Sequence, residues 1–347
     1  MQIPPFTLER QFQEIGSDIE EAVIKVLKGG QYIGGQEIAE FEENFASLVG
    51  VNHAVGCNSG TDALILALRA LDIGKGDEVI TSSFSFFATA EAISAVGANP
   101  VLVDINPNDY LINIDLIEGE INSNTKAIMP VHLFGNAVNM KSIKALAEKY
   151  NLKIIEDCAQ ATCTMWGNSK VGSIGDIGCF SFFPTKNLGA AGDGGAVTTS
   201  DQNIAKKVRE LAVHGSPKRY HHTQIGFNSR LDTLQAAVLN IKIKSVSKWI
   251  SNRKKIANNY LDLLEKNSFI HLPKIDSENV SHSWNQFVIK LKNYNYDINN
   301  DYSELFETDV NKNNSLRNLL KLRLSEKGIN SIISVSYTHL TLPTNGT

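Results

Sequence analysis

Lys186 lies in a setting that could turn an ordinary amine into a reactive one. An apolar stretch, residues 179–183, leads to Pro184 and then to this lysine, and a glycine-rich return at residues 189–196 follows it. Burial beside an apolar strand removes water from an ammonium group and lowers its pKa from about 10.4. An amine that loses its proton near neutral pH can form a Schiff base with a carbonyl compound. We therefore take Lys186 as the first candidate catalytic residue.

A carboxylate follows a second apolar segment. Residues 153–156 predict a strand, and Asp157 stands at its carboxyl end, where open α/β sheets bind their ligands. A buried carboxylate is costly unless a cation pairs with it. Two partners remain open from the sequence: an arginine of the protein, or the protonated ring nitrogen of a ligand. Gln160 could approach the same ligand from one side.

Residues 58–63 could bind a phosphate group. They stand between a predicted strand and a predicted helix, and the Gly60-Thr61 step would expose backbone N–H groups at the positive end of the helix dipole. The Thr61 hydroxyl would add one donor. The alternative is an ordinary helix cap, in which Ser59, Thr61 or Asp62 satisfies only the helix itself.

The sequence lacks two common nucleotide-binding motifs. No GxGxxG follows the first predicted strand, and no GxxxxGK[ST] occurs. Residues 189–195 are rich in glycine, but in a different order, and they lead into a predicted strand rather than a helix. A phosphate bound at residues 58–63 would therefore belong to a cofactor smaller than a dinucleotide.

The composition is that of an ordinary globular protein and excludes several partners. The 347 residues, 42% of them hydrophobic and 20% charged, are enough for about two domains. A net charge of -4 gives no basic field for nucleic acid or an anionic membrane. We expect a cytoplasmic protein, because residues 1–8 hold no signal-peptide core and no apolar run of about 20 residues could span a bilayer. The four cysteines lack CxxC spacing and are expected to be buried free thiols rather than zinc ligands: Cys57, Cys158, Cys163 and Cys179.

The elements that must position these residues predict an α/β domain built on a mostly parallel sheet. Amphipathic spacing predicts helices at residues 6–28, 37–49, 61–71, 89–96 and 141–150. Apolar runs predict strands at residues 53–57, 78–81, 100–103, 127–131 and 153–156, with further short strands within 173–183 and at 195–199.

The pattern changes after residue 231. One apolar stripe from Leu231 to Tyr260 predicts a single long connecting helix. Residues 284–291 then predict a strand of a smaller second domain. Residues 293–314 are polar and rich in Asn and Asp, which is typical of a surface insertion.

Five motifs in this order resemble the DegT/DnrJ/EryC1/StrS family of sugar aminotransferases, over about residues 6–260. They are residues 58–64, 76–81, 156–160, 180–195 and 226–232. The resemblance implies an enzyme of fold type I that depends on pyridoxal 5'-phosphate (PLP), with a large domain and a smaller C-terminal α+β domain. Its members aminate nucleotide-linked keto-sugars.

The resemblance also implies roles around the cofactor ring. Lys186 would bind PLP as a Schiff base and then act as the general acid and base of a 1,3-proton shift. Asp157 would keep the pyridine nitrogen protonated, which deepens the electron sink. Gln160 would lie near the ring hydroxyl. Phe86 is implied to stack on the ring, although Phe84 and Phe87 compete for this role.

The phosphate would be bound mainly by the backbone N–H groups of Gly60, Thr61 and Asp62, together with Ser181. Asn228 is implied to complete this site from a neighbouring subunit. Activity would then require at least a homodimer.

Substrate contacts are implied for Arg230, Tyr32 and His222. Arg230 would clamp the nucleotide diphosphate, or else be a structural residue at a helix start. A metal site is not expected at the His221-His222 pair, because adjacent residues of a strand face opposite sides. His132 could support Asp157, or could be a satisfied histidine beside a strand end.

Lysine at position 186 separates two activities within the resemblance. A branch of the family that dehydrates its substrate carries histidine there, so the lysine favours amination. We expect L-glutamate as the amino donor and a dTDP- or UDP-linked keto-hexose as the acceptor, in surface-polysaccharide or deoxyamino-sugar synthesis. Residues 219–222 and 228–237 look most like those of members that act on 3-keto sugars. The alternatives are a PLP-dependent nucleotide-sugar dehydratase, and a catalytically silent regulator that binds a nucleotide-sugar.

The predicted domain limits are residues 1–240 for the large PLP-binding domain and 241–335 for the small domain. The resemblance weakens near residues 328–330, after which the expected tyrosine- and proline-containing strand is missing. Residues 336–347 are expected to be a non-native tail on a truncated small domain.

Overall fold

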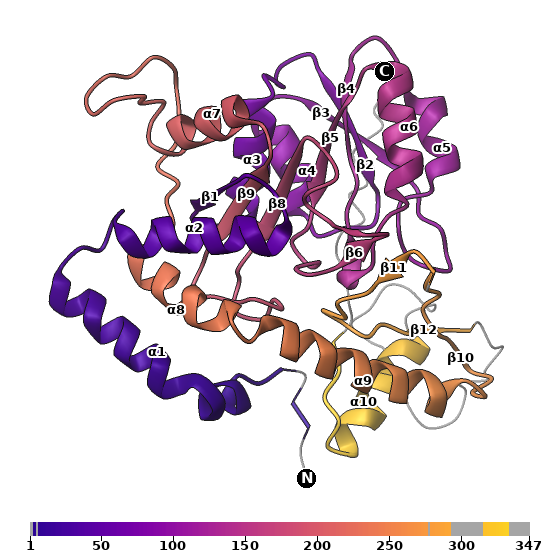
Figure 1. Ribbon diagram of the computed structural model, residues 1–347. Coiled ribbons are helices and arrows are strands. Elements are labelled where there is room, and N and C mark those ends of the chain that lie inside the picture. The colour runs from indigo at the N-terminus through magenta and orange to yellow at the C-terminus, as the bar shows by residue number, and fades with distance from the viewer. Residues whose placement is uncertain (1–2, 5, 277, 293–314, 333–347) are drawn as a thin grey trace.

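A seven-stranded mixed sheet forms the centre of the molecule (Figure 1). The computed structural model describes residues 3–4, 6–276, 278–292 and 315–332. The strand order is β1-β9-β8-β5-β4-β2-β3; β9 is antiparallel to both neighbours and the other pairs are parallel. The strands are β1 His53–Cys57, β2 Glu78–Ser82, β3 Asn99–Val103, β4 Thr125–Met129, β5 Lys153–Asp157, β8 Ile177–Ser181 and β9 Gly195–Thr199. The predicted mostly parallel α/β sheet is confirmed.

Alternate residues of each strand supply apolar cores on opposite faces of this sheet. Val79 and Ile155 pack in one core, whereas Ile80 and Ile154 pack in another. The first core is covered by α3 Gly60–Ala70, α4 Ala88–Ala95 and α7 Gln202–Ala212. The other face is covered by α2 Gln36–Val49 and α8 Thr233–Ile243 near β1, and by α5 Ile114–Glu120 and α6 Met140–Tyr150 near β4. Helix α1, Glu9–Gly29, packs on α8.

The helices predicted from the sequence do not include α5, whose apolar face is small, or α7, which is short and mostly polar. Helix α5 has seven residues and buries Ile117 alone. Helix α7 buries Ala205, Val208, Leu211 and Ala212 within a polar segment. Their N-caps carry the clearer signal. Asn113 and Asp201 each accept hydrogen bonds from the first backbone N–H groups of the helix that follows.

The single long helix expected from residue 231 to 260 is wrong. Helix α8 ends at Ile243, and α9 begins at Val246 and runs to Leu264. At the break, the N–H of Ser245 donates to the carbonyl of Lys242, three residues back rather than four. Helix α8 is buried along most of its length, whereas α9 buries only Val246 and Ala257. The apolar stripe continues through both helices, so periodicity could not reveal the break between them.

The strand expected over residues 284–291 is also wrong for most of its length. Only β12, Lys290–Leu291, is extended and paired, with β10, Ile270–His271. Residues before it are fixed to the large sheet's loops instead: the N–H of Ser283 donates to Gly135 O, and Trp284 has a φ of 50°. Backbone groups used in this way cannot form a ladder.

The C-terminal segments contact a small sheet beside the main one. Strand β11, Val280–Ser281, pairs with β6, Met165–Trp166, which pairs with β7, Ser169–Lys170. Helix α10 spans Ser315–Glu326. The expected insertion at 293–314 and the expected tail at 336–347 lie outside the described residues, and the domain limit near residue 240 stays a prediction.

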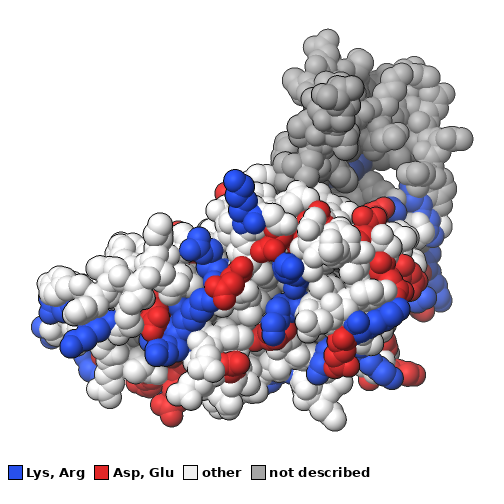
Figure 2. Space-filling view, turned by 90° about the horizontal axis from the view of Figure 1, so that it is seen from above, with Lys and Arg blue, Asp and Glu red and all other residues white. Residues whose placement is uncertain are grey.

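Charges of both signs are interspersed over the face drawn in Figure 2, without an extended patch of one sign. This distribution agrees with the small net charge of -4. Within the described ranges, the helices are too short or too polar for any of them to cross a bilayer.

Candidate active site at the carboxyl edge of the sheet

The candidate residues converge where parallel strands end. Asp157 is the last residue of β5 and Ser181 is the last of β8, and these two strands pair in parallel with Asp157 opposite Cys179. Strand β1 is parallel to them, and the chain leaves it to begin α3 at Gly60. Because parallel strands end at one edge of the sheet, residues far apart in sequence meet there.

Asp157 is buried, with 4% of its surface exposed. Its Oδ1 accepts the N–H of Ala159 at 3.1 Å, and its Oδ2 accepts the Thr89 hydroxyl at 2.9 Å. Burial raises the pKa of Asp157, and these two donors and the charge of Lys186 oppose that rise. Among the residues that the structure describes, no basic side chain lies within 4.0 Å of this carboxylate. The arginine partner that the sequence left open is therefore not found there.

Lys186 follows the break in the chain that the sequence indicated. Its backbone N–H donates to Phe183 O at 2.9 Å, which closes a turn through Pro184. Burial lowers the pKa of the Lys186 ammonium, and the negative charge of Asp157 partly restores it. The two groups are thus near enough to affect each other's charge.

Lys242, which is buried, holds the loop that follows the half-buried Lys186. Lys242 of α8 donates from Nζ to Gly189 O at 2.7 Å. Burial also lowers the pKa of Lys242. Gly189 must be glycine, since a Cβ there would lie 2.5 Å from Pro184 O. This support for the Lys186 turn crosses 53 residues and has no local sequence signal.

The start of α3 fits both readings of residues 58–63. Ser59 is the N-cap, and its hydroxyl accepts the N–H of Asp62 at 3.1 Å. The first N–H groups of a helix have no partner within it, so capping at Asp62 leaves those of Gly60 and Thr61 available. A Cβ at Gly60 would lie 2.6 Å from the Ser181 Cβ. Ser181 is therefore packed directly against the helix start, as a shared phosphate site requires.

Of the three phenylalanines near β2, Phe84 is committed to the core. Its ring lies 6.3 Å from each of the Tyr110 and Phe134 rings. Phe86 and Phe87 remain 69% and 44% exposed. Phe86 thus stays available to stack on a ligand, with Phe87 as its remaining competitor.

The side-chain amide of Gln160 is oriented by a hydrogen bond to its oxygen. Its Oε1 accepts the N–H of Phe134 at 2.9 Å, so the amide NH₂ group is left as the donor that could reach a ligand.

Asn228 and Arg230 flank a buried serine. The Ser229 hydroxyl donates to Asn58 Oδ1 at 3.2 Å, which brings this loop to the end of β1. Asn228 is exposed although Ser229 is fully buried, so its side chain points outward. Within the described ranges no ion pair involves Arg230.

Tyr32 and His222 are not joined to the candidate site by a contact within the described chain. Tyr32 lies beside the start of α8, because its carbonyl accepts the N–H of Thr233. His222 lies in the exposed α7–α8 connection, which projects at the upper left of Figure 1, and its Nδ1 is 3.0 Å from His214 O. Their substrate contacts stay predictions.

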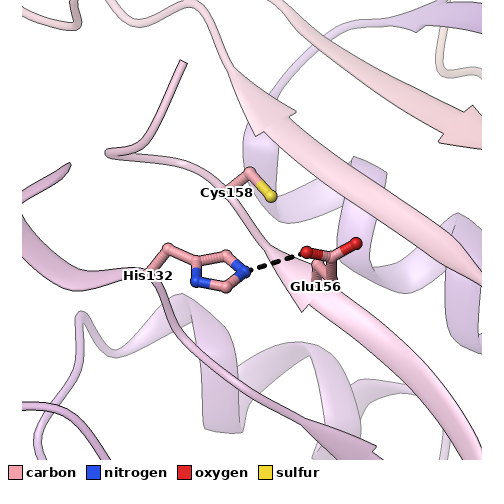
Figure 3. Close-up of side chains that lie close together, drawn as sticks. All are labelled: His132, Glu156 and Cys158. Atoms are coloured by element: carbon pink, nitrogen blue, oxygen red, sulfur yellow. Dashed lines mark hydrogen bonds and ion pairs between the residues drawn. The ribbon is translucent and has the colours of Figure 1, made fainter. Parts of the chain in front are cut away.

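Behind Asp157, three buried groups come close together: His132, Glu156 and Cys158 offer ligand atoms within 4.8 Å of one another (Figure 3). Glu156 accepts three hydrogen bonds, from the N–H groups of Ile174 and Gly175 and from His132 Nε2 at 3.0 Å. These contacts tie the end of β5 to the segment that precedes β8.

The hydrogen bonds of His132 argue against a metal in this cluster. Its Nδ1 accepts the N–H of Val138 at 3.2 Å, so the ring proton lies on Nε2 and points at Glu156. Burial raises the pKa of the Cys158 thiol well above its usual range, which keeps the sulfur protonated. His132 is therefore a histidine whose ring nitrogens are both satisfied, and its backbone N–H donates separately to the backbone carbonyl of Asp157 at 3.0 Å.

The cysteine prediction is largely confirmed. All four cysteines are free thiols, and Cys57, Cys158 and Cys179 are buried. Cys163 is half-buried, and burial raises the pKa of its thiol to about 11.

Sequence reasoning missed Thr89 and Ser85, which reach Asp157 from another element. The Thr89 hydroxyl bonds both Asp157 and the Ser85 hydroxyl. The sequence predicts Thr89 only as the first residue of a helix. Its spacing of four residues from Ser85 is the signal that could have indicated a contact between the two hydroxyl groups. Asn187 was missed as well: beside Lys186, it donates from Nδ2 to Ser283 O at 3.1 Å.

Known proteins resemble this chain in sequence and in fold. Residues 13–310 match the model of the DegT/DnrJ/EryC1/StrS aminotransferase family. A UDP-N-acetyl-3-dehydro-alpha-D-glucosamine 3-aminotransferase of Acidithiobacillus ferrooxidans is 46% identical over 83% of this chain and 78% of its own. A dTDP-3-amino-3,6-dideoxy-alpha-D-galactopyranose transaminase of Aneurinibacillus thermoaerophilus is 47% identical over 84% of this chain and 79% of its own.

Two solved structures extend the likeness to the fold. DesV of S. venezuelae, in complex with a ketimine intermediate, superposes with a TM-score of 0.86 at 36% identity, covering 95% of this chain and 82% of its own. NtdA of Bacillus subtilis, with bound cofactor PMP, gives a TM-score of 0.83 at 30% identity, covering 96% of this chain and 72% of its own.

The role of Glu156 as a buried hydrogen-bond acceptor can be tested by replacing its carboxylate with the amide of glutamine. In Glu156→Gln, an NH₂ group would face the His132 Nε2–H, leaving a buried donor unpaired. We expect the free energy of unfolding in urea to fall by roughly 2–3 kcal/mol. Glu118→Gln is the control, because Glu118 bonds Lys149 at the surface and should change stability little. Equal losses in both variants would contradict the assignment.

Proposed function

This chain belongs to the DegT/DnrJ/EryC1/StrS aminotransferase family, and we propose that it transfers an amino group to the keto carbon of a nucleotide-linked sugar with PLP as its cofactor. One observation carries the proposal. A buried carboxylate, a lysine with a lowered pKa and the start of a helix packed on Ser181 lie at the same edge of the sheet.

The residues present fit the chemical groups of PLP. Asp157, buried without a cationic partner within 4.0 Å in the described chain, suits a protonated pyridine nitrogen. The N–H groups of Gly60 and Thr61, with the Ser181 hydroxyl, suit the phosphate. The exposed ring of Phe86 suits the face of the pyridine. When bound, PLP supplies the electron sink that stabilises negative charge at the carbon next to the amino group.

Lys186 and Asp157 would perform complementary tasks. Burial lowers the pKa of Lys186, so a larger fraction of the amine is neutral near pH 7, able to attack a carbonyl carbon and to carry a proton. Asp157 would hold a proton on the ring nitrogen by its negative charge. A cation at that position would also offset the cost of burying the carboxylate.

The acceptor proposed is a 3-keto sugar linked to a nucleoside diphosphate, with L-glutamate as the amino donor. Relatives whose names place the amino group at carbon 3 of UDP- and dTDP-sugars support the carbon and the class. Arg230 would bind the diphosphate, for which a guanidinium has matching geometry. Tyr32 and His222 would lie toward the sugar. The setting proposed is synthesis of surface polysaccharide or of a deoxyamino sugar.

A dehydratase and a silent regulator remain the rival functions. The lysine at position 186 supports amination over dehydration. The paired placement of Lys186 and Asp157 supports catalysis over binding alone. Mass spectrometry after incubation of nucleotide keto-sugars with glutamate distinguishes the three: amination adds nitrogen to the sugar, dehydration removes oxygen as water without adding nitrogen, and a silent regulator leaves the mass unchanged.

Borohydride reduction tests the role of Lys186. In the presence of PLP, reduction should leave a phosphopyridoxyl group on Lys186, located by peptide mass spectrometry. Lys186→Ala should lose both the label and the visible absorbance of the bound cofactor. Lys242 is an internal control, since burial lowers its pKa too but Gly189 O occupies its ammonium. A label on Lys242, or none, would contradict the proposal.

Gly60→Ala tests the phosphate site. The new Cβ would lie 2.6 Å from the Ser181 Cβ and force the helix start away from Ser181. The dissociation constant of PLP, from absorbance titration, should rise at least about tenfold. Gly119→Ala in α5 is the matched control, because nothing lies within 4 Å of its added Cβ. An unchanged dissociation constant in Gly60→Ala would place the phosphate elsewhere.

Subunit mixing tests whether Asn228 acts across a dimer. The outward side chain of Asn228 supports a role in a second copy's site. Lys186→Ala and Asn228→Ala chains, each impaired alone, should regain activity when co-assembled, because each hybrid dimer would hold one intact site. No recovery in hybrids shown to be dimeric would place Asn228 in the site of its own chain.

A further inference from the structure

We propose that Thr89 is a positioning residue for Asp157, and that Thr89 and Ser85 couple the orientation of this carboxylate to the turn that carries Phe86. The inference rests on the function proposed above, in which Asp157 pairs with the ring nitrogen. It concerns how the chain keeps that carboxylate charged and aimed.

The hydroxyl groups form a chain with one direction. Thr89 Oγ1 is 2.9 Å from Asp157 Oδ2 and 2.6 Å from Ser85 Oγ. An ionised Asp157 can only accept, so Thr89 gives it its single proton. Ser85 must then donate to Thr89. All three residues are buried, which excludes water as a competing donor.

The two carboxylate oxygens are held by different parts of the chain. Oδ1 is bonded to the N–H of Ala159, two residues further along the chain, which fixes the carboxylate only relative to its own backbone. Oδ2 is bonded to Thr89 in the first turn of α4, which is 68 residues away in sequence. Among the described residues, only Thr89 therefore fixes the carboxylate by a hydrogen bond from another helix or strand.

The same turn presents Phe86. The N–H of Thr89 donates to Phe86 O at 3.1 Å, and buried Ser85 and Thr89 lie on either side of the exposed phenylalanine. Displacing Thr89 would thus move both the carboxylate that faces the ring nitrogen and the aromatic ring proposed to stack on the cofactor. Capping does not explain the arrangement, because the N-cap of α4 is Phe87 and makes no side-chain bond.

Other titratable groups face Asp157 and set the background for the test. They are Lys186 from the β8–β9 connection, His132 from the β4–α6 connection, and the Cys158 and Cys179 thiols. The substitutions at Thr89 leave all of them in place.

Thr89→Val removes the hydroxyl and keeps the shape. Without this donor the negative charge of Asp157 is less favoured, so the ring nitrogen of the cofactor would hold its proton less well. The Nζ of Lys186, once joined to the cofactor, would then become more basic. We expect the dissociation constant of PLP to rise about tenfold. The pH midpoint of the cofactor's visible band should rise, by up to about one pH unit. Thr89→Ser, which keeps the hydroxyl, should restore most of both values.

Thr81→Val is the matched control. Thr81 is also a buried threonine, and its hydroxyl donates to Met129 O at 2.8 Å, away from Asp157. Unfolding in urea, without PLP, should show similar losses for Thr81→Val and Thr89→Val. Only Thr89→Val should change the dissociation constant and the midpoint.

The outcomes separate this inference from the proposed function. Wild-type protein that binds no PLP at Lys186, or Asp157→Asn with an unchanged midpoint, would overturn the function. If wild-type protein binds PLP but Thr89→Val and Thr81→Val have the same pH midpoint and the same PLP affinity, the inference alone is overturned. If Thr89→Val does not fold, Ser85→Ala replaces it: a smaller rise in the midpoint supports the hydroxyl chain, and no rise contradicts it.

Discussion

Burial of the Asp157 carboxylate is the constraint on which the rest of the site depends. A charge at the end of a buried strand must be stabilised, and this chain supplies donors from its own backbone and from α4, with Lys186 and His132 nearby. Each of these comes from a different connection at one edge of the sheet. Burial raises the pKa of Asp157 and lowers that of the half-buried Lys186, so loss of water shifts both groups toward their neutral forms.

The topology of the sheet makes this convergence possible. Strands β1, β5 and β8 are parallel and end at one edge, whereas β9 is antiparallel and begins there. The glycine-rich return after Lys186 can therefore re-enter the sheet at Gly195, where a Cβ would lie 2.3 Å from Ser59 O. Glycine at this position and at Gly60 allows the start of α3, the end of β8 and the start of β9 to pack directly together.

A layer of neutral and paired groups supports the charged ones from behind. Glu156 takes three hydrogen bonds and fixes His132, which in turn bonds the backbone of Asp157. Lys242 fixes the loop after Lys186 through Gly189 O. These buried groups are satisfied by backbone partners and, for His132 and Glu156, by each other, so they hold loops in place without competing for a ligand.

Local sequence determined the strands, most of the helices and the residue types that could do chemistry, because apolar periodicity and strand-end position are properties of short segments. It therefore identified Lys186, Asp157 and the helix start at Gly60, and the order of its motifs indicated the family. It could not show that α8 and α9 are separate helices, since one stripe of apolar residues runs through both. The resemblance indicated Phe86 but left Phe84 as a competitor, because both are phenylalanines of one loop; only the packing of Phe84 against Tyr110 and Phe134 commits Phe84 to the core. Thr89, Glu156 and Lys242 were decided by tertiary structure alone: each acts through a hydrogen bond to a residue of another segment, and such pairs exist only once the strands have brought the segments together.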